Sequence, residues 1–121
     1  MADPRSDYDL IPGLTDPFRR LVEGVQDYAI LLLDKSGHIL SWNAGAQQLK
    51  GYSAGEIVGR HISTFYTEEA KARKWPDQEL QLAQAQGRFE DEGWRVRKDG
   101  TLFWANIIIT ALKDDHGVPC G

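Results

Sequence analysis

The sequence predicts an α+β fold in which short helices pack on an antiparallel sheet, and three observations point to this fold class. Two runs rich in aromatic and β-branched residues flank Asp99-Gly100, which predicts a long β-hairpin over residues 88–112. Capping and helix-ending residues recur between Thr15 and Gly87. Strands and helices do not alternate one by one, as a parallel sheet would require.

Length and composition indicate one small globular domain. The 121 residues are 41% hydrophobic and 26% charged, which suffices for one core. A net charge of −4 argues against a nucleic-acid partner and against direct contact with an anionic membrane. The single cysteine, Cys120, cannot form an internal disulfide, and neither a signal peptide nor a membrane-spanning apolar run is evident. We therefore expect a cytoplasmic protein.

The N-terminal part is predicted to contain a flexible lead, residues 1–14, and an amphipathic helix, residues 15–26. Thr15 or Asp16 caps this helix and Pro17 lies in its first turn. Its apolar residues share one side: Phe18, Leu21, Val22 and Val25. The helix either packs on its own domain or forms a dimer or signalling contact, and in both cases it would cover an apolar face of the sheet.

A second, shorter hairpin is expected next. The apolar run 28–33 leads into the turn Asp34-Lys35-Ser36-Gly37, and residues 38–42 would form the returning strand.

Several short helices follow this hairpin. Asn43 is placed to cap a helix over residues 44–50 that Gly51 ends, a structural role that we favour over ligand contact. Ser53-Ala54-Gly55-Glu56 matches a capping box and predicts a short helix before Gly59.

The longest helix is predicted from Pro76 to about Gln86. Thr67-Glu68-Glu69 gives a weaker helix-start signal before it, and Gly87 ends it. Its apolar positions are Leu80, Leu82, Ala83 and Ala85.

The second strand of the long hairpin is apolar on both faces. Phe103, Ala105, Ile107 and Ile109 alternate with Trp104, Asn106 and Ile108. We expect the protein's helices to cover the first face, and the N-terminal helix or a second subunit to cover the other.

A series of short motifs occurs in a characteristic order: Asp27-Tyr28-Ala29-Ile30, Asp34-Lys35-Ser36-Gly37, Trp42-Asn43, Gly51-Tyr52-Ser53, Glu56-Ile57-Val58-Gly59-Arg60 and Arg97-Lys98-Asp99-Gly100-Thr101. With these motifs the chain resembles a PAS domain, and more narrowly the sensory-box PAS modules of bacterial histidine kinases. The resemblance covers about Val25 to Gly121, and we assign residues 27–121 to this domain. It implies a five-stranded antiparallel sheet with small helices over one face.

The family's last strand is missing from this sequence. That strand lies in the middle of the sheet, between the strands expected at 28–33 and 102–112, but only Val118-Pro119-Cys120-Gly121 follow the turn 114–117. Buried backbone groups without partners cost about 1–3 kcal/mol each. We therefore expect the neighbouring strands to close up directly, or a second chain to lend a strand.

No cofactor or metal is predicted from the family's binding motifs. The segment from Gly59 to Phe65 has no cysteine for a flavin photoadduct, and Ala105 stands where the flavin-contacting Asn usually sits. No histidine for haem lies between Lys74 and Gly87. His61 is more readily explained as a hydrogen-bonding residue than as an iron ligand, and the three histidines lack metal-ligand spacing.

The resemblance implies a cup between the sheet and the helices. The residues expected to line it are Leu31, Leu33, Ile57, Ile62, Phe65, Tyr66, Leu80, Trp94, Phe103, Ala105, Ile107 and Ile109. Either these side chains fill the cup as ordinary core, or they leave a pocket for a small organic ligand. A dimer face is expected to be formed by Phe18, Leu21, Val22, Val25, Tyr28, Ile30, Leu32, Trp104 and Ile108.

The expected function is that of a sensory module. Glu90, Asp91 and Glu92 form a solvated edge, not a catalytic pair, so we do not expect this chain to be an enzyme, although its parent is expected to be a histidine kinase. The first hypothesis is a PAS input module that relays a ligand or protein signal to downstream kinase or response-regulator domains. The alternative is a ligand-free structural module that holds two chains together as a homodimer.

Overall fold

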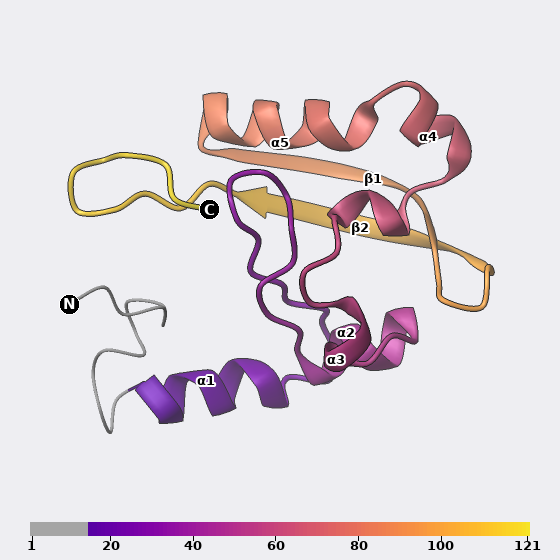
Figure 1. Ribbon diagram of the computed structural model, residues 1–121, viewed down its shortest axis with the longest axis horizontal. Coiled ribbons are helices and arrows are strands. Elements are labelled where there is room, and N and C mark those ends of the chain that lie inside the picture. The colour runs from indigo at the N-terminus through magenta and orange to yellow at the C-terminus, as the bar shows by residue number, and fades with distance from the viewer. Residues whose placement is uncertain (1–14) are drawn as a thin grey trace.

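The computed structural model describes residues 15–121, and the lead expected over residues 1–14 lies outside them. Six helices and two strands follow in the described part: α1 (Thr15–Gly24), α2 (Ala44–Lys50), α3 (Ala54–Ile57), the 3₁₀ helix η2 (Ile62–Phe65), α4 (Glu68–Ala72), α5 (Trp75–Gln86), β1 (Arg88–Val96) and β2 (Leu102–Thr110) (Figure 1). The predicted α+β class is confirmed.

The predicted long hairpin forms from β1 and β2, which pair in antiparallel register. Its turn is longer than expected, because the Arg97 N–H donates to the Thr101 carbonyl at 2.9 Å and Lys98, Asp99 and Gly100 make the connection. Gly100 alone has a positive φ there, 86°, while an Asp99 oxygen accepts from the Thr101 N–H at 2.9 Å. The connection is therefore a three-residue hairpin loop whose last residue, Gly100, is left-handed. It is not the two-residue type I′ turn, in which both residues have a positive φ.

The inner face of the hairpin is covered by helices, as expected. Helix α5 contacts both strands and η2 contacts β1 (Figure 1). The largest cluster of buried apolar residues lies on this helical side: Ile39, Trp42, Ala46, Ile57, Ile62, Phe65, Tyr66 and Ala70. Burial of the larger of these side chains stabilises the fold by about 1.5–3 kcal/mol each.

The prediction that residues 28–42 form a second hairpin of two strands is wrong. One isolated bridge joins Leu33 to Ile39, and no strand forms over residues 28–33. The ladder stops because a side chain replaces a backbone partner: the Ile30 N–H donates to Asn43 Oδ1 at 2.9 Å. The segment is therefore extended but only partly paired.

Asn43 joins this extended segment to α2. Its Oδ1 accepts from the Ala46 N–H at 2.9 Å, which confirms the predicted cap. Its Nδ2 donates to the carbonyls of Val25 at 3.1 Å and Tyr28 at 2.8 Å. The side chain is almost fully buried, so these bonds position the whole segment before it.

The other predicted helix signals are also confirmed. Gly51 ends α2 with a φ of 86°, and Gly87 ends α5 with a φ of 84°. Glu56 Oε1 accepts from the Ser53 N–H at 2.7 Å, as a capping box requires.

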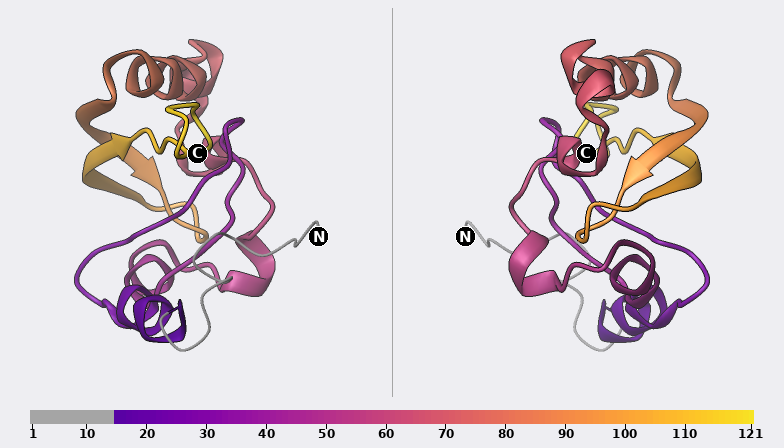
Figure 2. Two further views of the ribbon diagram at one scale, coloured as in Figure 1. Left: turned by 90° about the vertical axis from the view of Figure 1, so that its left-hand side faces the viewer. Right: turned by 90° about the vertical axis from the view of Figure 1, so that its right-hand side faces the viewer.

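Helix α1 does not cover the outer face of the hairpin, so that expectation is wrong. It ends at Gly24 and contacts α2 (Figure 2). The Gly45 N–H donates to the Val25 carbonyl at 2.8 Å, which ties the chain leaving α1 to α2. Trp94, Trp104 and Ile108 on the outer face are consequently more than half exposed.

The expected direct closure between segment 28–33 and β2 does not occur. The chain turns back after β2, and Leu112 exchanges hydrogen bonds with the last residues: its N–H donates to the Gly121 carbonyl and its carbonyl accepts from the Cys120 N–H, both at 2.8 Å. Gly121 also approaches the Leu33 carbonyl so closely that a Cβ would lie 2.7 Å from it. Gly121 thus lies next to both Leu33 and Leu112.

Candidate functional site

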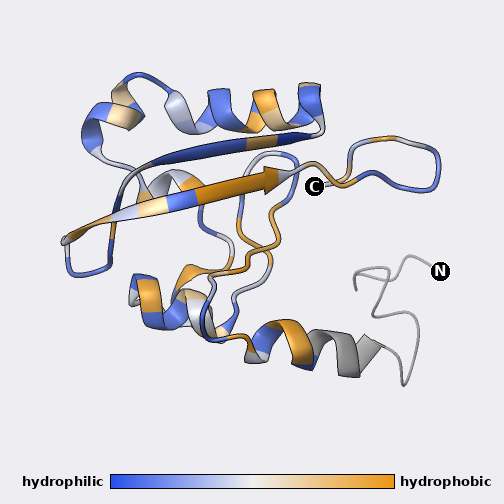
Figure 3. Cartoon of the chain, turned by 180° about the vertical axis from the view of Figure 1, so that it is seen from behind, coloured by the Kyte–Doolittle hydropathy of each residue, from blue (hydrophilic) through white to orange (hydrophobic). Residues whose placement is uncertain are grey.

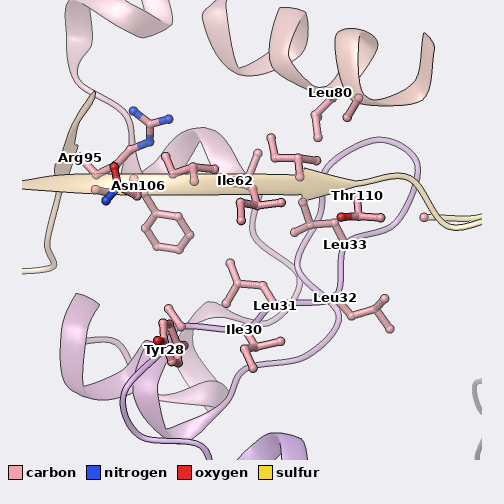
Figure 4. Close-up of a pocket in the computed structure, with 18 of the residues that line it drawn as sticks. Tyr28, Ile30, Leu31, Leu32, Leu33, Ile62, Leu80, Arg95, Asn106 and Thr110 are labelled. Carbon is pink, nitrogen blue, oxygen red and sulfur yellow. The ribbon is translucent and has the colours of Figure 1, made fainter. Parts of the chain in front are cut away.

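A cavity of about 500 Å³ lies between segment 27–35 and β2. Helix α5 contributes Leu80 to it, while Leu31 and Leu32 reach it from the extended segment (Figure 4). The end of α2 closes it with Leu49 and Lys50. It therefore occupies the space that the separation of the two segments creates.

Most of the residues expected in the cup line this cavity: Leu31, Leu33, Ile62, Phe65, Tyr66, Leu80, Phe103, Ala105, Ile107 and Ile109. Two others lie elsewhere. Ile57 is fully buried in the core cluster. Trp94 is 52% exposed on the outer face of the hairpin, so its assignment to the cup is wrong.

The register of the hairpin explains the error at Trp94. Trp94 pairs with Trp104, and their rings meet edge to face with centroids 5.2 Å apart. The next residue, Arg95, pairs with Phe103 and takes the inner position instead. Directly paired residues share a face of the sheet, so the inner residue could have been assigned once the register was known.

The residues expected at one dimer face are spread over three places. Tyr28, Ile30 and Leu32 line the cavity, because it lies at the strand edge, where side chains of both alternating phases reach it. On α1, Leu21 and Val22 are exposed and Val25 just after it is half-buried, while the Phe18 side chain lies outside the described part. Trp104 and Ile108 lie on the hairpin, where β2 is largely apolar and β1 largely polar (Figure 3).

A buried ion pair forms one wall of the cavity. Arg95 Nη2 lies 3.0 Å from Glu79 Oε1, with side-chain exposures of 5% and 0%. The guanidinium also lies over the Tyr66 ring, 4.0 Å from its centroid. Burial raises the pKa of the Glu79 carboxyl above its ordinary value, an effect that the Tyr66 hydroxyl and Arg95 oppose.

Lys50 is a second buried cation at the cavity, only 9% exposed. Its Nζ lies 4.6 Å from the centroid of the Phe65 ring and 5.0 Å from that of Phe103. Among residues 20–121, whose side chains are described, no carboxylate pairs with it. Burial, together with the smaller effect of the Arg95 and Arg97 charges, lowers the pKa of Lys50 from 10.5 to about 8.

Sequence reasoning missed the buried charged residues Lys50 and Arg95 in the cavity wall and the ion-pair partner of Arg95, Glu79, although the first two carried a usable signal. Lys50 lies four residues after Ala46, on the buried face of the same helix. Arg95 follows from hairpin register. Glu79 is fully buried on α5. Its burial could not be predicted from the sequence, because a charged Glu rarely occupies a core position.

The histidines of the described part take part in local hydrogen bonds. His61 Nε2 lies 2.8 Å from the Ser36 carbonyl, and its Nδ1 accepts from the Ser63 N–H at 3.1 Å. Between Thr15 and Gly121 no group of three or more His, Cys, Asp or Glu residues is arranged to hold a metal ion. None of the helices described over that range is both long and apolar enough to span a bilayer.

Comparison with known proteins identifies related chains. Residues 27–121 match the family described as the PAS domain. Over 99 residues the chain is 48% identical to two-component system protein A of Emericella nidulans, a match that covers 82% of this chain and 14% of that protein. This relative is fungal, so it does not support the bacterial origin that the motifs suggested.

Solved structures share the fold. The PAS domain of a protein from Colwellia psychrerythraea has a TM-score of 0.74 at 20% identity, covering 88% of this chain and 91% of that chain. A domain of the sensory box sensor histidine kinase/response regulator from Geobacter sulfurreducens has a TM-score of 0.70 at 15% identity, covering 86% and 88% respectively. The family match extends over most of the chain and its fold is that of these structures, so this chain belongs to the PAS domain family.

Proposed function

We propose that this chain is the sensory input module of a two-component signalling protein and that a small organic ligand in the cavity is its signal. The cavity carries this proposal, because its volume of about 500 Å³ falls within the range of about 300–1,000 Å³ typical of ligand sites. Its wall is mainly apolar with a few charged groups, which is also typical of such sites. The similarity to a two-component system protein supports the signalling role.

The structure offers a route for the signal. A ligand in the cavity would contact β2, α5 and the extended segment 28–33 at once. That segment is only partly paired, and Asn43 ties its start to α2 and to the end of α1. Ligand binding would favour one position of the segment and so shift the adjoining helices α1 and α2. Such a population shift can be transmitted to a kinase or response-regulator partner.

The cavity residues do not fit the two familiar cofactors. Cys120 is the only cysteine of the chain; it is exposed and absent from the cavity wall, so no sulfur is available for a flavin photoadduct. No histidine lies among the described residues of the wall either, so haem would lack its usual ligand. The proposal assigns binding and relay to this chain, and no catalytic step.

A thermal-shift screen of small organic acids, alcohols and amines against the chain tests the proposal. A ligand at about a hundred times its Kd should raise Tm by roughly 5 °C or more. Ala105→Leu, which places extra carbons in the cavity, should abolish that rise, whereas Ala85→Leu on the exposed side of α5 should not. A screen without stabilising ligands, or an equal rise in the Ala105→Leu variant, would contradict the proposal.

A homodimerisation role is a second candidate, supported by the outer face of the hairpin. Trp94 and Trp104 are 52% and 54% exposed and stack edge to face, with Ile108 also exposed beside them on the same face. Exposed aromatic clusters of this kind are typical of protein–protein interfaces.

A further inference from the structure

Lys50 differs from the two arginines near the cavity because no carboxylate pairs with it among the residues whose side chains are described. Arg95 is paired with Glu79 at 3.0 Å. Arg97 donates from Nε to the Leu49 carbonyl at 3.0 Å and from Nη1 to Thr101. Lys50 has only the faces of two aromatic rings, and its ammonium has no hydrogen-bond acceptor in the part of the chain that the structure describes.

A residue of this kind is costly for folding. The Lys50 ammonium is largely removed from water and has no carboxylate partner among the described side chains, which opposes its burial, and the nearby guanidinium groups repel it. An unbranched apolar side chain such as Met would fill the space between the Phe65 and Phe103 rings without that cost. Positions that break a packing rule in this way are expected where they serve binding.

The surroundings of Lys50 define the ligand that would suit it. Apart from its charged residues, Asp27, Asp34, Lys35, Lys50 and Arg95, the cavity is lined largely by aliphatic side chains, among them Leu31, Ile62, Leu80 and Ile107. One ammonium between two aromatic rings suits a compact, singly charged anion, and the aliphatic wall suits an apolar body. A positively charged ligand group would be disfavoured next to Lys50, because Arg95 and Arg97 also lie close enough to repel it.

We propose that the cavity binds an amphipathic monocarboxylate, with its carboxylate paired to Lys50 Nζ and its apolar part along the aliphatic wall. This rests on the proposed function, whose ligand it specifies. Lys50 lies next to the inward-facing Phe103, whereas the backbone of Leu112, beyond the end of β2, is hydrogen-bonded to Cys120 and Gly121. The carboxylate position is therefore separate from the backbone edge.

Titration calorimetry with three ligands of equal chain length tests this inference near neutral pH: octanoate, octanol and octylammonium. Octanoate should bind the chain with one-to-one stoichiometry and at least about tenfold more tightly than octanol, because a charge-assisted bond is added. Octylammonium should bind most weakly. Nuclear magnetic resonance should show octanoate-dependent shifts of the Phe65 and Phe103 ring protons.

Variants separate the role of Lys50 from general effects. Lys50→Met should bind octanoate no more tightly than octanol, and Lys50→Arg should keep the preference for octanoate. Lys71→Met removes an exposed lysine on α4, away from the cavity, and should behave as the unaltered chain does. Circular dichroism of each variant checks that the helices are retained.

The outcomes distinguish this inference from the proposed function. Equal binding of octanoate and octanol, or a preference for octanoate that survives in Lys50→Met, would overturn the carboxylate assignment while leaving a ligand-binding cavity. Failure of all three ligands to bind would overturn the carboxylate assignment as well. The sensory role would be overturned by the thermal-shift results, either by the absence of any stabilising compound or by an equal rise of Tm in the Ala105→Leu variant.

Discussion

Buried polar residues of this domain serve two different purposes. Asn43 satisfies backbone groups on three segments, so its burial stabilises the fold. Glu79 and Arg95 compensate each other, although Glu79 Oε2 has no hydrogen-bond partner among the described residues. Lys50 satisfies no backbone group and pairs with no carboxylate in that part of the chain, so its charge opposes folding.

The difference in the free energy of unfolding between Lys50→Met and the unaltered chain should therefore depend on pH. The pKa of Lys50 is lowered from 10.5 to about 8 in the folded chain, so between these values the unfolded chain binds more protons and stability rises with pH. The cost of the charge is fully present below about pH 8 and is lost towards pH 10.5. Lys50→Met should thus be more stable near neutral pH by roughly 1–3 kcal/mol, after lost cation–π contacts are deducted.

Urea unfolding of both proteins at matched pH values measures this difference. The advantage of Lys50→Met should shrink as the pH is raised from about 7 to about 10, while other lysines and tyrosines titrate alike in both proteins and cancel. A difference that stays constant with pH, or an unaltered chain that is the more stable at neutral pH, would show that the Lys50 charge is not a burden in the fold.

Elements of this domain depend on a few close backbone contacts. Gly45 lies in α2 against the extended segment, and its N–H donates to the Val25 carbonyl at 2.8 Å. A Cβ at Gly45 would overlap the Tyr28 carbonyl group, whereas a Cβ at Gly55 in α3 would meet open space. Two helical glycines therefore have opposite roles.

Gly45→Ala should destabilise the domain by roughly 1–3 kcal/mol, the usual cost of overpacking, because the obstructing atoms belong to backbone. Gly55→Ala should instead be neutral or stabilise it by up to about 1 kcal/mol through helix propensity. Thermal unfolding of both variants measures the contrast. Equal effects of the two substitutions would indicate that α2 and the extended segment do not pack as closely as described.

Local chemistry made most elements predictable, and its limits explain why the expected shorter hairpin does not form as a pair of strands. Asn43, Gly51 and the Ser53–Glu56 capping box act within a few residues, so their patterns gave the helix ends correctly. The strand expected at 28–33 needs partners on both sides. Here the N–H groups of Ile30 and Leu32 donate to the side chains of Asn43 and Ser41, and the cavity lies where a neighbouring strand was expected. A local sequence pattern does not indicate either feature.

The outer face of the hairpin belongs to the scale of the whole molecule. The sequence indicated that this face needs a cover, and α1 does not supply it. A second copy of the chain would bury Trp94, Trp104 and Ile108 together, because they lie on one face of paired strands.

Analytical ultracentrifugation tests this prediction. The chain should sediment as a dimer at tens of micromolar, and Trp104→Glu should shift it to monomer by placing a charge in the apolar interface. Leu40→Glu, a change at an exposed residue outside the hairpin, should leave the dimer intact. A monomeric unaltered chain, or a Trp104→Glu variant that still dimerises, would contradict the dimer.

By itself the sequence determined the fold class, the long hairpin, the helix ends and the family, because alternation, capping and turn residues act over short distances. Most of the residues expected in the cup also line the cavity, but many other lining residues were not expected there. Only the tertiary structure decided that α1 lies against α2, that Trp94 faces outward, and that Lys50 lines the cavity together with Arg95, which pairs with the buried Glu79. These features depend on strand register and on packing between segments distant in the chain. The free energy of such contacts cannot be predicted from the sequence of one segment alone.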